Sequence, residues 1–371
     1  MFRLALRNLF QNRLRMLFSV SGVGLALLLT ISLSAIVAGY ETQLTAYVQN
    51  SGADVWVSQA GVRNLHMASS TLPDTAAEQV RGVQGVQSVT PILYMSNMVD
   101  FANRKRLSYV IGLPPDPAAG TAPSALGTRV PASGTIVVDR LLADQLGARM
   151  GDQVEILGSP LTIAGLSDGT ASIINFVSFV TAADFRRIRP TPGATSYLLV
   201  KGAPGQSPAA LAERISRTLP AVTVQTTAQF ANSEKQIVHD MSTDVINVMS
   251  LVGFLIALAV MALTVYVATR ARSSEYGVIK AVGGSNADLY RVVLWQALMT
   301  VALGYVLAVV GSLLLAAAVP LVEPLLSLVI SPESLLRTGG FALVIAALAA
   351  VLPIRQLAGL DPVKVFSRRY A

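Results

Sequence analysis

The feature that most constrains this sequence is a long run of residues without charge, from Val245 to Thr269. A helix rises about 1.5 Å per residue, and the hydrocarbon core of a bilayer is about 30 Å thick. The 25 residues of this run are therefore long enough to cross a membrane as one helix. We predict a transmembrane helix at residues 245–269.

Three further uncharged runs cover residues 16–40, 292–322 and 338–354. Hydrophobic residues make up 53% of the chain and charged residues 13%, a composition typical of membrane proteins. Proline lacks a backbone N–H, so we expect Pro320 to end the third helix early. The predicted fold is an α-helical membrane protein with four transmembrane helices, at residues 17–40, 245–269, 292–319 and 338–355.

Charge gives the orientation of these helices, because Lys and Arg beside a span favour its cytoplasmic side. Segments 1–16, 270–291 and 355–371 together hold twelve Lys or Arg and three Asp or Glu, a net charge of +9. Segment 41–244 has a net charge of −1. We expect a multi-pass protein of the bacterial inner membrane with both termini in the cytoplasm. The basic excess then reflects topology, and no nucleic-acid partner is expected.

The predicted cytoplasmic segment at the N-terminus, residues 1–16, has apolar residues at helical spacing with arginines between them. This pattern predicts an amphipathic helix in the headgroup layer. The alternative is the basic region of a signal peptide, but the apolar run that follows is about twice the usual length, which favours a retained anchor. Small residues four apart within the spans indicate close helix packing and weakly support a dimer: Gly22 and Ala26, Ala35 and Gly39, Gly304 and Ala308.

Between the first and second spans, residues 41–244 are long enough for a large mixed α/β extracytoplasmic domain, or for two subdomains joined at Gly112–Pro131. A short extracytoplasmic loop is expected at 320–337, a cytoplasmic loop at 270–291 and a tail at 356–371. Residues 231–244 are expected to continue as a helix into the second span. Predicted strands are 54–58, 134–139, 153–157, 161–165 and 196–200, and predicted helices are 74–81, 140–146, 182–188 and 207–219.

Motifs of catalysis are missing from this sequence. It has no phosphate-binding loop of the Gly-x-x-x-x-Gly-Lys-Ser/Thr type, no His-Glu-x-x-His and no Gly-x-Ser-x-Gly. Cysteine is absent, and neither His66 nor His239 has a carboxylate at ligand spacing, so both are interpreted as surface or packing residues. No catalytic residue, metal site or cofactor of its own is predicted. Energy for any work should come from a partner.

Several motifs resemble those of one family. Ser274–Ser285, reading SEYGVIKAVGGS, resembles the loop between the second and third spans in permeases of the MacB/FtsX-like ABC transporter superfamily. Leu360–Phe366 (LDPVKVF) is similar to that family's closing signature, and Leu6–Leu9 (LRNL) to its opening helix. Within the middle domain, Val130–Gly165 resembles a passage common in the family, through Leu146-Gly147 and the Gly-Asp-x-Val at 151–154.

This resemblance implies a non-enzymatic permease subunit of the mechanotransmission type, similar to compact members such as DevC and haem-exporter permeases. It implies a homodimer in the lipid membrane, served by a separate cytoplasmic ATPase that binds ATP and Mg, and by a membrane-fusion or other extracytoplasmic partner. The expected activity is export or extraction of an amphiphile such as a lipid, glycolipid, haem or drug-like molecule. One alternative is an FtsX-like transducer that regulates a cell-wall hydrolase or sensor. Another is a membrane-anchored hydrolase active in domain 41–244 alone.

The cytoplasmic loop carries the predicted partner site. Residues 274–281 can form a short helix with Tyr276, Ile279 and Lys280 on one face, followed by a glycine turn. Ser285 and Asp288 fit a capping box for the next helix. The resemblance implies that this is the coupling helix which docks on the ATPase, and the alternative is a solvated hairpin. The predicted coupling residues are Glu275, Tyr276, Val278, Ile279, Lys280, Gly283 and Gly284.

Candidate substrate residues lie at the predicted outer boundary of the membrane: Tyr40, Glu41 and Glu323. An ionisable group beside hydrocarbon is unfavourable unless it meets water, a cation or a ligand. Both acids could simply be hydrated at the interface, and Tyr40 could serve only as an aromatic anchor.

Overall fold

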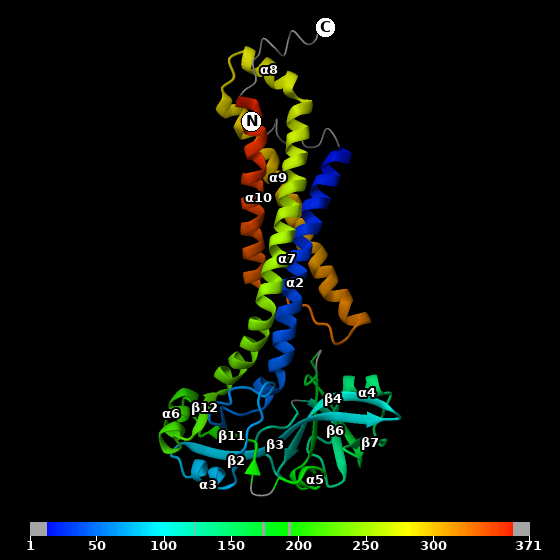
Figure 1. Cartoon of the computed structure of the whole chain (residues 1–371), viewed down its shortest axis with the longest axis vertical. Coiled ribbons are helices and arrows are strands. Elements are labelled where there is room, and N and C mark those ends of the chain that lie inside the picture. Colours follow the sequence, from blue (N-terminus) through cyan, green and yellow to red (C-terminus); the bar gives the residue numbers. More distant parts are fainter. Residues whose placement is uncertain (1–12, 123, 173–174, 192–193, 359–371) are drawn as a thin grey trace. The chain divides into compact units, whose positions relative to one another are not determined.

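The computed structural model describes residues 13–122, 124–172, 175–191 and 194–358. The opening and closing motifs at 6–9 and 360–366 lie outside the described residues, as do most of the predicted helix at 1–16 and most of the tail. The described chain forms two compact units (Figure 1). The helical unit contains the residues up to Ala38, Ser242–Glu323 and the residues from Ser327, and the α/β unit contains Gly39–Met241 and Pro324–Leu326.

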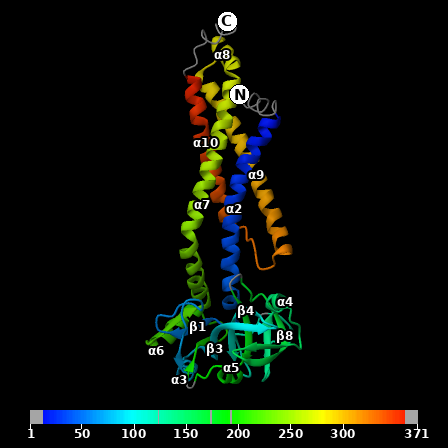
Figure 2. The same cartoon turned by 45° about the vertical axis from the view of Figure 1, so that its right-hand side comes forward.

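Four long helices are apolar enough to cross a membrane, among the described residues, with candidate spans at Met16–Asn50, Asn247–Ala271, Asn286–Val322 and Pro332–Arg355. The predicted helical membrane fold is therefore confirmed. A short fifth helix lies between the second and third, and α9 and α10 run side by side in both views (Figures 1 and 2). The helices are α2 (Arg13–Asn50), α7 (Thr227–Ala271), α8 (Ser273–Ala281), α9 (Asn286–Val322) and α10 (Pro332–Ala358).

The expectation that Pro320 ends the third helix is wrong, because α9 continues through it to Val322. Proline removes a single donor, and the Glu323 N–H still reaches the Val319 carbonyl at 2.9 Å. The fourth helix starts earlier than residue 338. It begins at Pro332, whose fixed φ suits a first helical turn, and it takes in Arg337. The guanidinium of Arg337 donates to Ser34 Oγ at 3.1 Å.

The small residues predicted to allow close packing do so within this one chain. A Cβ on Gly304 would lie 3.0 Å from Val23 Cγ1 and 3.3 Å from the Gly24 nitrogen, so α9 and α2 touch almost backbone to backbone. A Cβ on Gly22 would lie 2.7 Å from Val260 Cγ1 of α7. Ala308 is fully buried as well. These residues therefore give no support to a dimer.

The α/β unit is built on a ten-stranded sheet among the described residues, in the order β12-β1-β11-β3-β4-β9-β6-β8-β5, with β7 pairing with β3 and β8. All its pairings are antiparallel except β4 with β9 and β6 with β8. A small second sheet joins β10 (Ala194–Thr195) to β2 (Leu72–Pro73). The strands of the main sheet are β1 (Val55–Gln59), β3 (Val86–Phe101), β4 (Arg104–Leu113), β5 (Ser124–Gly127), β6 (Thr135–Asp139), β7 (Gln153–Ile156), β8 (Ser159–Asp168), β9 (Phe176–Thr181), β11 (Tyr197–Gly202) and β12 (Val222–Thr226).

The four short helices predicted in this unit form within a residue of their expected ends, as α3 (Thr75–Arg81), α4 (Arg140–Leu146), α5 (Ala182–Ile188) and α6 (Pro208–Thr218). Side-chain caps start two of them. Asp139 accepts the Leu141 N–H at 2.9 Å, and Thr181 accepts the Asp184 N–H at 3.0 Å. The long β3–β4 hairpin was not predicted. It turns at Ala102 and Asn103, which have φ of 50° and 65° and do not form a typical Asn-Gly turn.

The segment 112–131, expected to join two subdomains, contributes β5 to the sheet, and residues before β5 pack in the core of the same unit. Ala119 and Ala122 are 3% and 1% exposed, and the Gly120 N–H bonds to the Ser51 carbonyl. An aromatic cluster fills the core beside it. Trp56 of β1 stacks on Phe230 of α7 with ring centroids 4.7 Å apart and meets Tyr47 of α2 edge-on at 6.1 Å. The ends of α2 and α7 that belong to this unit are thus fixed in its core.

Candidate functional site

The predicted coupling loop begins with α8, which ends in a tight turn at two glycines. Gly283 has a φ of 97°, which a residue with a side chain rarely adopts. A Cβ on Gly284 would lie 2.7 Å from the Ile279 carbonyl oxygen, which instead accepts the Gly284 N–H at 2.8 Å. The two glycines therefore make the turn that brings the chain back toward the helices.

A side-chain cap then starts α9. Ser285 Oγ accepts the Asp288 N–H at 3.2 Å and donates to the Asp288 carboxylate at 2.7 Å. Arg291 lies one turn further on, with its Nη1 3.8 Å from the same carboxylate. The capping arrangement expected from Ser285 and Asp288 is confirmed, with a bond between the two side chains in place of the usual return bond to the cap N–H.

The face of α8 predicted to carry Tyr276, Ile279 and Lys280 packs on the helices. Tyr276 is 1% exposed and belongs to the apolar core of the helical unit, with Leu289 and Val292 of α9, and Ile279 packs against the same core. Lys280 is half-buried. The other face is exposed to solvent. The side chain of Glu275 is 63% exposed, and Val278 and Val282 are 46% and 84% exposed.

The three candidate substrate residues fall in different units. Tyr40 and Glu41 belong to the α/β unit, where both are half-buried on α2, and the backbone carbonyl of Glu41 accepts the Thr45 hydroxyl at 2.9 Å. Glu323 belongs to the helical unit, where it is exposed and caps the C-terminal end of α9. A substrate role for these residues stays a prediction.

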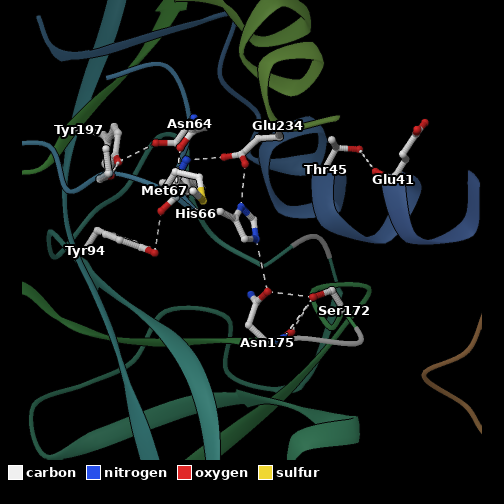
Figure 3. A network of polar contacts seen from close by, with 12 residues as sticks. Glu41, Thr45, Asn64, His66, Met67, Tyr94, Ser172, Asn175, Tyr197 and Glu234 are labelled. Carbon is white, nitrogen blue, oxygen red and sulfur yellow. Dashed lines mark hydrogen bonds and ion pairs between the residues drawn. The ribbon is translucent and has the colours of Figure 1, made fainter. Parts of the chain in front are cut away.

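A polar cluster that sequence spacing did not predict joins α7 to the loop 60–71 between β1 and β2 (Figure 3). Glu234 of α7 has a side chain with no exposure, and its Oε2 lies 2.7 Å from Nδ1 of His66, whose side chain is 12% exposed. The other carboxylate oxygen, Oε1, accepts the N–H of Leu65. Both oxygens of this buried carboxylate therefore bind the same loop, as a buried charge requires.

The same loop is held by the sheet from its other side. The Tyr94 hydroxyl of β3 donates to the Leu65 carbonyl at 2.9 Å, and the Tyr197 hydroxyl of β11 lies 3.2 Å from both the Asn64 and Ala68 carbonyls (Figure 3). The ring of His66 also meets Tyr109 edge-on, with centroids 4.9 Å apart. The loop thus links α7 to two central strands through hydrogen bonds.

The second nitrogen of His66 extends the cluster. Nε2 lies 3.4 Å from Oδ1 of Asn175, which precedes β9, and that oxygen accepts the Ser172 hydroxyl at 2.8 Å (Figure 3). His66 therefore lies between a carboxylate on α7 and an amide on the sheet side. In the described part of the chain, no three His, Cys, Asp or Glu side chains gather to hold a metal ion.

Burial keeps the surrounding phenols neutral. It raises the pKa of Tyr109 to about 12, and burial, with the negative charge of Glu234 as a further cause, raises the pKa of Tyr94 and of Tyr197 above the ordinary value. Tyr94 and Tyr197 consequently remain hydrogen-bond donors to the loop carbonyls at every physiological pH.

One sequence signal for this cluster did exist. Phe230, Glu234 and Val238 recur every four residues on α7, and all three are buried, so a carboxylate interrupts an otherwise apolar stripe. Its partner could not be found from spacing, because His66 lies 168 residues earlier in the chain.

Comparisons with known proteins agree with this architecture. The family model of the MacB-like periplasmic core domain matches residues 16–218, more than half of the chain. The model of the FtsX-like permease C-terminal domain matches residues 247–362. The first match covers α2 from residue 16 and the α/β unit through α6, and the second covers α7 from residue 247 together with α8, α9 and α10.

The chain is also similar to individual proteins along its whole length. An uncharacterized ABC transporter permease of Mycobacterium bovis is 24% identical over 374 residues, covering 98% of each chain. Another, of Mycobacterium tuberculosis H37Rv, is 22% identical over 373 residues, with the same coverage.

Two solved structures resemble part of the chain at 12% identity and a TM-score of 0.37. They are the extracellular domain of the ABC-type transporter YknZ from Gram-positive bacteria, which matches 47% of this chain and 99% of its own, and the periplasmic region of MacB from Actinobacillus actinomycetemcomitans, which matches 50% and 94%. The two family models, the full-length relatives and the four apolar helices together show that this chain belongs to the MacB/FtsX-like superfamily of ABC transporter permeases.

Proposed function

We propose that this permease couples ATP hydrolysis by a separate cytoplasmic ATPase to movement of its α/β domain, and so exports or extracts an amphiphile. The chain would lie in the bacterial inner membrane as a homodimer, with α8 and both termini in the cytoplasm. The charge distribution supports that orientation, since the basic excess falls on the segments that include α8. ATP and Mg would be bound by the partner.

The observation that carries the proposal is the two-sided packing of α8. Its inner face, with Tyr276, belongs to the core that α8 shares with α9. Its outer face carries Val278 and the acidic Glu275, both exposed, and the exposed Val282 follows directly after the helix, four residues from Val278. A short helix with an exposed apolar stripe is suited to enter a groove of another protein. Pressure on that stripe would be passed to the helices through the buried side.

Movement of the membrane helices would be transmitted to the α/β domain along α7. This helix has 45 residues without a proline from Thr227 to Ala271, and its first turns carry Phe230, which stacks on Trp56. A continuous helix transmits displacement along its axis because each turn is hydrogen-bonded to the next. Tyr40, Glu41 and Glu323 remain the candidate residues for contact with the amphiphile.

The test is to co-express the chain with the ATPase encoded beside it and to measure ATP hydrolysis in lipid nanodiscs. The double substitution Val278→Ala and Val282→Ala should abolish the stimulation of hydrolysis and weaken co-purification of the ATPase. Tyr276→Phe, which preserves the buried ring, is the matched control and should retain both. Full stimulation by the double variant would refute the role of this face.

The nature of the cargo is tested separately. Mass spectrometry of the purified complex should find a bound lipid, glycolipid, haem or similar amphiphile. Recovery of a cell-wall hydrolase or sensor with no amphiphile would instead support an FtsX-like transducer.

A further inference from the structure

We propose that the contact of Glu234 with His66 and Leu65 is a mechanical joint that makes the α/β domain follow α7 as one rigid body. This inference rests on the function proposed above, because it says how the movement of α7 enters the domain. In this role Glu234 and His66 are positioning residues, and the loop 60–71 is the connecting piece between helix and sheet.

The first step of the argument is the burial of a charge on a helix that has to move. The Glu234 side chain has no exposure, and its two oxygens meet His66 Nδ1 and the Leu65 N–H. Separating a buried carboxylate from its hydrogen-bond partners leaves it uncompensated, which is strongly unfavourable. Sliding of α7 past the loop is therefore opposed more strongly here than at an apolar contact, where one methyl group can replace another.

The second step is that the loop is fixed at its far side. Tyr94 and Tyr197 hold the carbonyls of Asn64, Leu65 and Ala68, and these tyrosines belong to β3 and β11, which pair with each other within the sheet. A load that reaches Leu65 from Glu234 consequently passes to the middle of the sheet.

The third step compares this contact with the other attachments of the first turns of α7. Thr227 begins the helix directly after β12, and its N–H and hydroxyl donate to the Asp54 and Ala53 carbonyls. Phe230 stacks on Trp56 one turn away from Glu234, and this contact is made by apolar ring faces. The carboxylate bonds have a fixed direction. The aromatic contact thus supplies burial, the Thr227 bonds fix the start of α7, and the Glu234 contact fixes the turn that carries it against the loop 60–71.

The chain has no cysteine, which permits a clean labelling experiment. Gln236→Cys on α7 and Gln79→Cys on α3 are both exposed sites, and spin labels on them report the distance between helix and domain. The full chain would be measured with its ATPase in nanodiscs, nucleotide-free and with ATP bound. In the parent, the inter-label distance should be the same in both states. With Glu234→Gln, or with the combined His66→Gln and Glu234→Gln, the distance should differ between the states.

A matched control is provided by Arg140 and Asp168, an exposed ion pair of the same 2.7 Å length in the same domain. Asp168→Asn should leave the distance unchanged in both states. ATP hydrolysis stimulated by the permease should persist in the Glu234 variants, because α8 is untouched. If the parent permease does not stimulate ATP hydrolysis by its ATPase, that result would count against the proposed function and not against the joint.

Three results would overturn the joint: a distance that already changes with nucleotide in the parent, an unchanged distance in the Glu234 variants, or an unfolded α/β domain in the combined variant. The last outcome would make the pair a requirement for folding alone. Thermal unfolding of the combined variant, followed by circular dichroism, identifies that case.

Discussion

Substitution of Gly304 by alanine tests the close contact of α9 with α2. The added Cβ would lie 3.0 Å from Val23 Cγ1, 3.2 Å from Val23 Cβ and 3.3 Å from the Gly24 nitrogen. Two of these atoms belong to the start of a stiff side chain or to backbone, so they cannot turn away. The helices must separate by a few tenths of an ångström, and the packing on both sides of the contact loosens.

The change in the free energy of unfolding caused by Gly304→Ala is the sum of two opposed effects. Glycine to alanine in a helix interior gains about 1 kcal/mol from backbone entropy. Overpacking of a close contact costs about 1–3 kcal/mol. The matched control is Gly340→Ala on α10, an exposed helical glycine whose added Cβ would have no neighbour within 4 Å. The control should gain about 1 kcal/mol, and Gly304→Ala should fall below it by about 1–3 kcal/mol.

The assay is reversible unfolding in mixed micelles with increasing sodium dodecyl sulfate, followed by circular dichroism, for the parent and both variants. The difference between the two alanine variants is the quantity of interest, because detergent effects common to both cancel. If Gly304→Ala is as stable as Gly340→Ala, the contact between α2 and α9 is not as tight as described, and the reasoning fails.

Three further predictions concern single side chains. Ser285→Ala removes the cap of α9 and should lower the free energy of unfolding by about 1 kcal/mol in the same micelle assay, whereas Ser285→Thr, which keeps a hydroxyl to accept the Asp288 N–H and to donate to its carboxylate, should retain most of it. Burial raises the pKa of Tyr109 from 10.0 to about 12, so its contribution to stability is complete below pH 10 and is lost as the pH rises through 12. Tyr109→Phe should therefore make the loss of stability at alkaline pH less steep, as followed by tyrosinate absorbance. An unchanged slope would contradict this. Glu234→Ala leaves His66 and the Leu65 N–H without their acceptor and should destabilise the α/β domain by about 3–5 kcal/mol. Asp168→Ala, at the exposed ion pair with Arg140, should destabilise it by at most about 1 kcal/mol. Equal shifts in the melting temperature of the two variants would show that burial of Glu234 has no energetic effect.

The membrane fold was predictable because uncharged runs of this length rarely occur outside membrane-spanning helices. The ends of the helices were not, since a charge was taken as the end of a span. α2 continues past Glu41 to Asn50, and α10 already contains Arg337, because a helix keeps its hydrogen bonds whether or not it has left the hydrocarbon. In the α/β unit, short helices with local caps were found, and the β3–β4 hairpin was missed because β4 is buried over its last six residues and shows no alternation.

The candidate site likewise has parts that could be predicted from the sequence and parts that could not. The helix at 273–281 and the cap at Ser285 are local in sequence and were predicted from it. The inward direction of Tyr276 depends on contacts with α9, which no short pattern contains. The pairing of His66 with Glu234 depends on the complete fold of the domain, so the sequence could show only an acid on an apolar stripe.

The length of α7 has a practical consequence. Its 45 residues extend roughly 68 Å, more than twice the thickness of the hydrocarbon core. In the proposed topology, this single helix therefore has turns in two aqueous compartments. In that topology, an antibody fragment or cyclic peptide that bound the turns around Gln236 on the extracytoplasmic side would inhibit the ATPase on the opposite side without having to cross the membrane.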